Sequence, residues 1–147
     1  MIFQKDSMHY KNVLSKNATF YYKDLGKQLE AFLLEIKDMG VHPNGPVFYA
    51  TNYISEEQQM NVEFFLPVRE EAADRNEIKY HSYYSSEQML SMRVTENFEE
   101  KTKEAYAAMI SYLNAAKLKQ TTPPFHILDR SGKQQFLTIK IGYLREE

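Results

Sequence analysis

The chain contains no cysteine and no tryptophan, and only 5 glycines and 5 prolines among its 147 residues. Without cysteine there are no disulfides, thiolate metal sites or cysteine nucleophiles, which is typical of proteins from a reducing compartment. Neither a P-loop nor a Rossmann glycine pattern occurs among so few glycines. A basic excess is also missing, because the formal net charge is -2. This charge argues against a nucleic-acid-binding surface.

Long hydrophobic runs are absent too, so the sequence predicts neither a membrane span nor a signal peptide, and we expect a cytoplasmic protein. The 4 histidines are scattered with none at metal-ligand spacing, and we expect no metal and no cofactor. Tyrosine, in contrast, is abundant, with 11 copies. Its flat apolar ring and polar tip suit either a strand surface or a ligand pocket.

Two parts of the chain share a similar order of residue types, and the length favours one domain spanning 1–147. Segment 45–52, followed by 61–68, is matched by segment 122–129, followed by 138–145. Such an internal echo predicts a duplicated unit. We expect repeat one at about 7–68, a linker at about 69–77 and repeat two at about 78–147. Duplicated units usually meet about a pseudo-twofold axis, where a cleft is expected.

Hydrophobic periodicity predicts eight strands and two helices. The strands are expected at 7–13, 18–23, 47–53, 60–68, 78–84, 89–94, 125–129 and 134–144. One helix should begin at Asp24 and stop at Gly40, and the other should begin at Asn97, which forms a capping pair with Glu100. Each repeat then has the order strand-strand-helix-strand-strand. The predicted fold is α+β, an antiparallel sheet with two helices packed on one face and a pseudo-twofold cleft on the other.

Strand parity divides the side chains between the two faces of this sheet. The helix-facing core is expected to contain Val62, Phe64, Leu66, Leu137, Ile139, Ile141 and Tyr143, together with Phe48, Ala50, Phe125 and Ile127. The opposite face is expected to carry the ligand-binding residues Glu63, Tyr49, Phe65, Tyr22, His126, Lys140 and Arg93. Aromatic and charged side chains gathered in this way favour a pocket lining. A plain solvated face of an antiparallel sheet is the alternative.

Three local patterns carry a resemblance to a known family: Asn12–Gly26 before the first helix, Gly40–Ala50 after it, and Asn61–Val68. Over nearly its full length the sequence resembles the GyrI-like effector-binding domains. These occur as the ligand-sensing halves of bacterial multidrug-responsive regulators and as stand-alone proteins. The resemblance implies two strand-helix-strand-strand repeats, an aromatic cleft, and often a buried glutamate that receives cationic drugs, a role that falls on Glu63. A carboxylate among aromatic rings suits a delocalised cation.

The sequence departs from the family pattern in two ways. It contains no helix-turn-helix segment, so we expect a stand-alone member rather than a transcription regulator. Lys140 also occupies the position equivalent to Glu63. A pair between the two would neutralise the carboxylate and favour an anionic or zwitterionic ligand, or none.

The leading hypothesis is a stand-alone protein that binds a small amphipathic organic molecule, cationic in the first instance, without catalysing a reaction. A second is a protein-interaction or adaptor module that docks a partner through the sheet face or the acidic loop at Glu56 and Glu57; a homodimer is left open. A third is a small-molecule hydrolase in which Glu63, close to His126 and Tyr49, activates water. Neither nucleic acid nor a membrane is expected as a partner.

Overall fold

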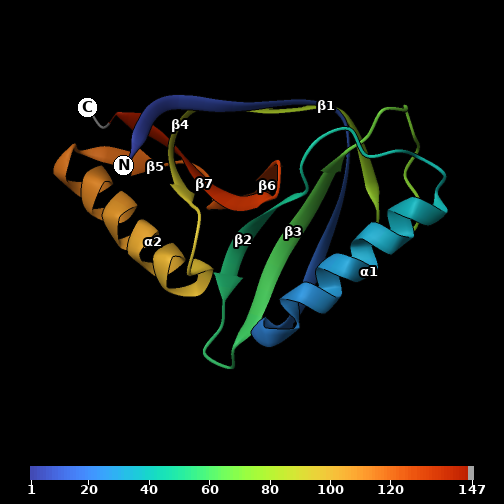
Figure 1. Ribbon diagram of the computed structural model, residues 1–147, viewed down its shortest axis with the longest axis horizontal. Coiled ribbons are helices and arrows are strands. Elements are labelled where there is room, and N and C mark those ends of the chain that lie inside the picture. Colours follow the sequence, from blue (N-terminus) through green and yellow to red (C-terminus); the bar gives the residue numbers. More distant parts are fainter. Residues whose placement is uncertain (146–147) are drawn as a thin grey trace. The chain divides into compact units, whose positions relative to one another are not determined.

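The computed structural model describes residues 1–145, and its helices and strands are shown in Figure 1. In chain order they are β1 (Phe3–Tyr21), the short 3-10 turn η1 (Tyr22–Asp24), α1 (Leu25–Asp38), β2 (Phe48–Ile54), β3 (Gln59–Pro67), β4 (Lys79–Val94), α2 (Phe98–Ala115), β5 (Leu118–Gln120), β6 (Phe125–Ser131) and β7 (Gln134–Arg145). The chain forms two compact units. We call His9–Ser85 the α1 unit, and Met1–Met8 with Ser86–Glu147 the α2 unit.

In the α1 unit, β3 lies between β1 and β2, and both pairings are antiparallel. Helix α1 lies along one face of these strands (Figure 1), with its buried Phe32 and Ile36 in one core with Phe64. Apolar residues at helical spacing give α1 this buried stripe. The helix ends where predicted, because Gly40 adopts the left-handed backbone that favours glycine, with φ 77°.

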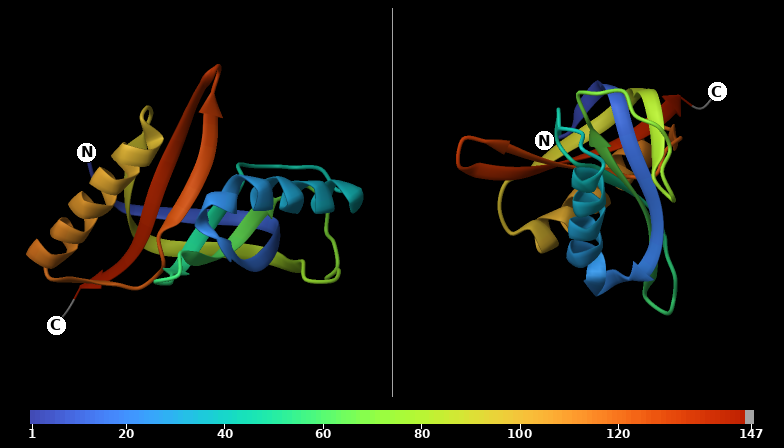
Figure 2. Two further views of the ribbon diagram at one scale, coloured as in Figure 1. Left: turned by 90° about the horizontal axis from the view of Figure 1, so that it is seen from below. Right: turned by 90° about the vertical axis from the view of Figure 1, so that its right-hand side faces the viewer.

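In the α2 unit, β7 lies between β4 and β6 in antiparallel pairings, and the short β5 pairs with the C-terminal end of β7. The β6 and β7 strands form a long hairpin (Figure 2). Helix α2 buries Ala105, Met109 and Leu113 in a core with Ile139 and Ile141. Each helix therefore has its own hydrophobic core.

The predicted sheet architecture is wrong. We expected an open sheet with two helices packed on one face and a cleft on the other. Instead β4 pairs with β7 in addition to its place in the strand order, and this pairing closes β4, β1, β3, β2, β6 and β7 into a six-stranded antiparallel barrel. Each helix packs into a core of its own, α1 in the α1 unit and α2 in the α2 unit.

The predicted order of strand-strand-helix-strand-strand is wrong for a related reason. The segments predicted as 7–13 and 18–23 belong to the single strand β1, and those predicted as 78–84 and 89–94 belong to β4. Residues with left-handed backbone lie inside both strands, Asn12 in β1 and Gln88 in β4. Such residues bend a strand without ending it. Strand β5 was not predicted.

The helix starts were predicted at the correct places but with the wrong chemistry. Asp24 and Asn97 are the residues before α1 and α2, yet neither forms a side-chain capping hydrogen bond. Asn97 has left-handed backbone, with φ 47°, whereas a capping asparagine normally has extended backbone. The predicted capping pair between Asn97 and Glu100 is therefore not formed.

Candidate functional site

An aromatic cluster occupies the face of the α1 unit that points away from α1. Phe65 of β3 stacks on Phe48 of β2, with ring centroids 4.7 Å apart, and contacts Tyr84 of β4 at the same distance. Tyr10 of β1 stacks on Phe48 at 5.1 Å, and His81 lies edge-on to Tyr84 at 5.8 Å. These distances are typical of favourable aromatic pairs. We call these five residues the aromatic cluster.

Glu63 lies next to this cluster on the same face, because it is two residues before Phe65 on β3. It pairs with Asn17 of β1 and Ala50 of β2. A hollow of about 470 Å³ opens beside it, which we call the Glu63 hollow; its lining residues are Ser15, Asn17, Glu63, Glu77 and Lys79. This volume lies within the range of pockets that hold small organic ligands.

The charges around the Glu63 hollow favour a cation, because two carboxylates and one ammonium group line it. The negative charge of Glu63 also acts on Tyr84 of the aromatic cluster. Burial of Tyr84, together with repulsion from the Glu63 carboxylate, raises the pKa of that phenol to about 12. A cation placed between this carboxylate and the aromatic rings would be attracted by both.

Ser15 connects the hollow to the cluster. Its backbone pairs with Phe65, and its hydroxyl oxygen lies 2.8 Å from Nε2 of His81. Ser15 is buried, and this bond satisfies a hydroxyl that would otherwise be costly to bury. The bond also fixes the orientation of the His81 ring beside Tyr84.

Only two of the predicted ligand-binding residues, Glu63 and Phe65, lie together on this face. Tyr49 pairs with Phe64 and packs against the α1 core, so it lies on the opposite face. Burial there raises its pKa to about 12. Tyr22 lies in η1, beyond the last β1–β3 pair, Tyr21 with Gln59, and is exposed. We therefore do not include Tyr49 or Tyr22 in the site.

The other three predicted residues lie in the α2 unit and have partners of their own there. Lys140 forms an ion pair with Asp6, and the guanidinium carbon of Arg93 lies 4.1 Å from the centroid of the Phe136 ring. His126 is buried on the α2 face, where its Nε2 hydrogen bonds to the Tyr106 hydroxyl. The trio proposed for water activation, Glu63, His126 and Tyr49, is thus divided between units and sheet faces.

Tyr10, His81 and Tyr84 were not predicted as site residues, and neither were Asn17 and Lys79. All five belong to β1 or β4. Each of these strands was predicted as two short strands. The alternation of side chains between the two faces could therefore not be followed along the whole of β1 or β4. The tyrosines within 80–84 could have indicated these residues, since aromatic side chains in an alternating segment favour a strand face that lines a pocket.

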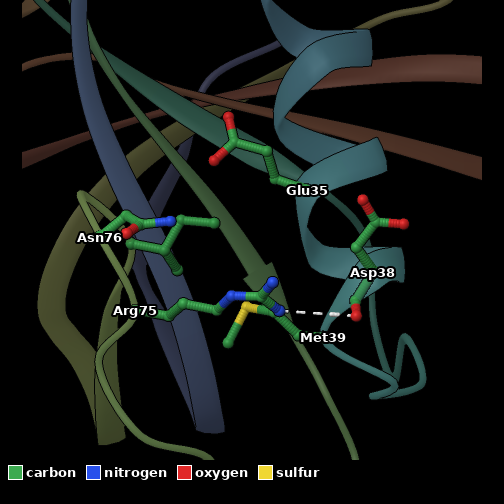
Figure 3. Close-up of a pocket in the computed structure, with 6 residues that line it drawn as sticks. Glu35, Asp38, Met39, Arg75 and Asn76 are labelled. Carbon is green, nitrogen blue, oxygen red and sulfur yellow. Dashed lines mark hydrogen bonds between the residues drawn. The ribbon is translucent and has the colours of Figure 1, made fainter.

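A second hollow, of about 190 Å³, lies at the C-terminal end of α1 (Figure 3). Its lining includes Glu35, Asp38, Met39, Arg75 and Asn76. Arg75 points across it and donates a long hydrogen bond, 3.5 Å, to the Asp38 carbonyl at the helix end. Glu35 is paired with Lys16 at 2.5 Å. Arg75 therefore caps the helix end and Glu35 forms an ion pair. Because both side chains have a structural role, we assign no ligand to this hollow.

A sequence profile built from related proteins matches residues 9–144, which is most of the chain. Its description is "Domain of unknown function (DUF5085)". The chain belongs to the DUF5085 family. No curated protein matches the sequence of this DUF5085 domain.

Solved structures share the fold of this DUF5085 domain at low sequence identity. The EcmrR–DNA complex contains a chain that is 12% identical with a TM-score of 0.76; the match covers 97% of this domain but 58% of that chain. The DUF5085 domain thus spans just over half of the EcmrR chain. The isolated EcmrR C-terminal domain is 11% identical with a TM-score of 0.73, and the match covers 97% of this domain and 99% of that one.

SAV2435, solved with bound tetraphenylphosphonium, is 9% identical with a TM-score of 0.56, and the match covers 98% of this domain and 93% of that chain. A hydrolase from Listeria innocua is 13% identical with a TM-score of 0.54, covering 95% and 92%. These likenesses show a common fold. The GyrI-like resemblance of the sequence stays a prediction beside this shared fold.

Two absences hold for the part of the DUF5085 domain that the structure describes. Within residues 1–145, histidine, aspartate and glutamate side chains do not gather in any group of three or more that could hold a metal ion. Neither helix in that range combines the length and apolar character that a membrane-spanning helix requires.

Proposed function

We propose that this DUF5085 domain is a cytoplasmic GyrI-like effector-binding protein for small amphipathic organic cations. The cation is held at the Glu63 hollow, with Glu63 as its charge partner and the aromatic cluster as the apolar wall. The observation that carries the proposal is that Glu63 lines a hollow of ligand size and lies on the same sheet face as the stacked aromatic rings.

Physical chemistry supports a delocalised cation over a compact one. A lipophilic cation loses little hydration energy on entering an apolar site, whereas an ammonium ion or a metal ion loses much more. Ring faces and a carboxylate attract the same charge, so their effects add. SAV2435 shares the fold and was solved with tetraphenylphosphonium, which is a cation of this kind.

A pair between Lys140 and Glu63 was the argument against a cationic ligand, but Lys140 has other partners in the structure. Lys140 donates a hydrogen bond to the Ser7 carbonyl and pairs with Asp6, both in its own unit. Lys79 is the ammonium group that lines the hollow with Glu63, and Glu77 offsets its charge.

The three residues predicted for the hydrolase alternative, Glu63, His126 and Tyr49, do not come together in the structure. Glu63 of β3 and Tyr49 of β2 lie on opposite faces of the sheet, and His126 hydrogen bonds to Tyr106. We therefore propose binding without catalysis.

A matched pair of ions provides the test. Tetraphenylphosphonium and tetraphenylborate have nearly the same shape and opposite charge, so their affinities separate charge recognition from hydrophobic capture. We expect the protein to bind the phosphonium and to prefer it at least tenfold over the borate, measured by isothermal titration. Glu63→Gln should weaken phosphonium binding about tenfold, which corresponds to roughly 1.4 kcal/mol.

Glu57→Gln is the matched control, since it removes the same charge from the exposed turn between β2 and β3. It should leave both affinities unchanged. Equal binding of the two ions, or a Glu63→Gln variant that binds phosphonium as the wild type does, would show that Glu63 is not the charge partner.

A further inference from the structure

Three asparagines form a hydrogen-bonded ladder across the strands of the α1 unit, on the same face as Glu63. At its centre is Asn61 of β3, whose carbonyl oxygen accepts from Asn52 of β2 at 2.7 Å and from Asn17 of β1 at 3.2 Å. Its own amide nitrogen donates to Asn17 and to the Thr19 hydroxyl, both at 2.9 Å. We call Asn17, Asn52 and Asn61 the amide ladder.

The stability of the strands does not explain this ladder. Asparagine is depleted in strands, where β-branched and aromatic residues pack better. Here three of them lie side by side on neighbouring strands and are at least partly exposed. Their hydrogen bonds therefore form in competition with water and add little to folding. The amide ladder is better explained by a role in binding a ligand.

The ladder leaves defined hydrogen-bonding groups for a ligand. Asn61 uses both of its amide protons and accepts two hydrogen bonds, so its capacity is filled. Asn17 and Asn52 each donate one amide proton to Asn61, and each has a second one. Asn61 thus orients two N–H donors, and its role is that of a positioning residue.

These donors lie beside the proposed cation position. Asn17 lines the Glu63 hollow and pairs with Glu63 across β1 and β3. Along β3, Asn61, Glu63 and Phe65 follow at alternate positions, so neighbouring members of this series lie about 7 Å apart. The face therefore presents amide donors, a carboxylate and aromatic rings in that order.

We infer that the ligand is a cation that carries an apolar ring system on one side and an uncharged hydrogen-bond acceptor, such as a carbonyl oxygen, about 7 Å from the charge on the other. The ring system packs on the aromatic cluster, and the acceptor takes the free amide protons of Asn17 and Asn52. This inference rests on the proposed function and narrows its ligand class from lipophilic cations in general to cations with a polar arm.

Two phosphonium salts test the inference: butyltriphenylphosphonium, and a matched salt in which the butyl chain ends in a primary carboxamide. We expect the wild type to bind the carboxamide salt about three- to tenfold more tightly, which is the worth of one net hydrogen bond. Asn17→Ala and Asn61→Ala should reduce this ratio of affinities to about one. Asn114→Ala, an exposed asparagine in α2, is the control and should keep the wild-type ratio.

The ratio separates recognition from folding, because the butyl salt serves as an internal reference in each variant. Equal binding of both salts by the wild type would overturn the inference and leave the proposed function standing. A wild-type ratio above three that Asn17→Ala and Asn61→Ala both retain would also overturn it. Binding of neither salt would overturn the proposed function, and this inference with it.

Discussion

Lys140 forms an ion pair with Asp6, with the Nζ atom of the lysine 3.2 Å from Oδ2 of the aspartate. Lys140 is mostly buried, with 14% of its side chain exposed. Lys140 lies on β7 between β4 and β6, whereas Glu63 lies on β3 between β1 and β2. The sequence predicted these two positions to be equivalent. The charge of Lys140 is therefore paired with Asp6 inside the α2 unit and not with Glu63.

The Asp6–Lys140 pair predicts a pH-dependent contribution to stability. Burial alone would raise the pKa of Asp6, but hydrogen bonds from the Ser7 backbone and the Ser91 hydroxyl, together with Lys140, outweigh it and hold that pKa below its ordinary 3.8. The carboxylate form is therefore favoured by folding. Its stabilisation is fully present above about pH 3.8 and is lost as the pH falls through the lower folded-state pKa.

Asp6→Asn should lower the free energy of unfolding at pH 7 by about 1 kcal/mol, a modest value because solvent screens this partly exposed pair. The difference from the wild type should shrink as the pH falls below 3.8. Urea unfolding at several pH values measures both. Glu57→Gln is the control for loss of one negative charge, and a constant Asp6→Asn difference across the pH range would contradict the prediction.

A second prediction concerns the buried His126. Its Nε2 hydrogen bonds to the Tyr106 hydroxyl, which joins β6 to α2. Tyr106→Phe keeps the ring and removes the partner of a buried polar atom, so it should destabilise the fold by about 1–3 kcal/mol. Thermal unfolding measures this. Tyr112, on the same helix, is half-buried and packs against the α2 core. Tyr112→Phe keeps the ring and should cost about 0.5 kcal/mol or less, and an equal effect of both variants would count against this assignment.

How well the sequence predicts the face that a residue takes differs between β3 and β2. On β3 the alternation of Val62, Phe64 and Leu66 with Glu63 predicted both faces correctly, because one face carries a charge. Strand β2 gave no such contrast, because Phe48 and Tyr49 are both aromatic. The actual register, Phe48 opposite Phe65 and Tyr49 opposite Phe64, reverses the predicted faces.

The same reversal occurs on β6. Phe125 and Ile127 were predicted to face the helix, with His126 opposite; instead His126 pairs with Ile139 of the α2 core, and Phe125 pairs with Lys140. All three residues are buried. When both faces of a strand are buried, alternation does not indicate which face is which, and only the pairing partner decides. The face that each residue of β3 takes was therefore predictable, whereas the faces of β2 and β6 residues were not.

A third prediction concerns Gly142 on β7. A Cβ atom there would lie 2.7 Å from Cγ2 of Thr122 and 2.8 Å from Oγ1 of Thr121, in the segment that follows β5. This segment is held in place, because the Gly142 N–H donates to the Thr122 hydroxyl and the Thr121 N–H donates to the Gly142 carbonyl. Gly142→Ala should therefore destabilise the fold by about 1–3 kcal/mol.

The matched substitution is Gly26→Ala, in the first turn of α1, where an added Cβ meets nothing within 4 Å. Alanine is the better helix former, so this variant should be neutral or stabilised by up to about 1 kcal/mol. Chemical denaturation of both variants measures the contrast. Equal loss of stability in the two would show that the close approach of Thr121 and Thr122 is not what excludes a side chain at position 142.

The last prediction separates the ring of Tyr84 from its hydroxyl. Tyr84 contacts Phe65 and Phe48 through its ring, and the Glu63 charge contributes to its raised pKa of about 12. If the ring attracts the cation, Tyr84→Leu should weaken tetraphenylphosphonium binding about three- to tenfold, the usual worth of one cation–aromatic contact. Tyr84→Phe should lose much less, because the ring stays.

The same pKa sets the expected pH dependence. A phenol that titrates at about 12 stays protonated between pH 6 and 9, so its ionisation contributes nothing to binding in that range. The loss caused by Tyr84→Leu should therefore be the same at pH 6 and at pH 9. Titration calorimetry at both values measures it, with Tyr53→Leu, an exposed tyrosine near the end of β2, as the control. Equal losses in Tyr84→Phe and Tyr84→Leu would show that the hydroxyl, and not the ring, is what the cation contacts.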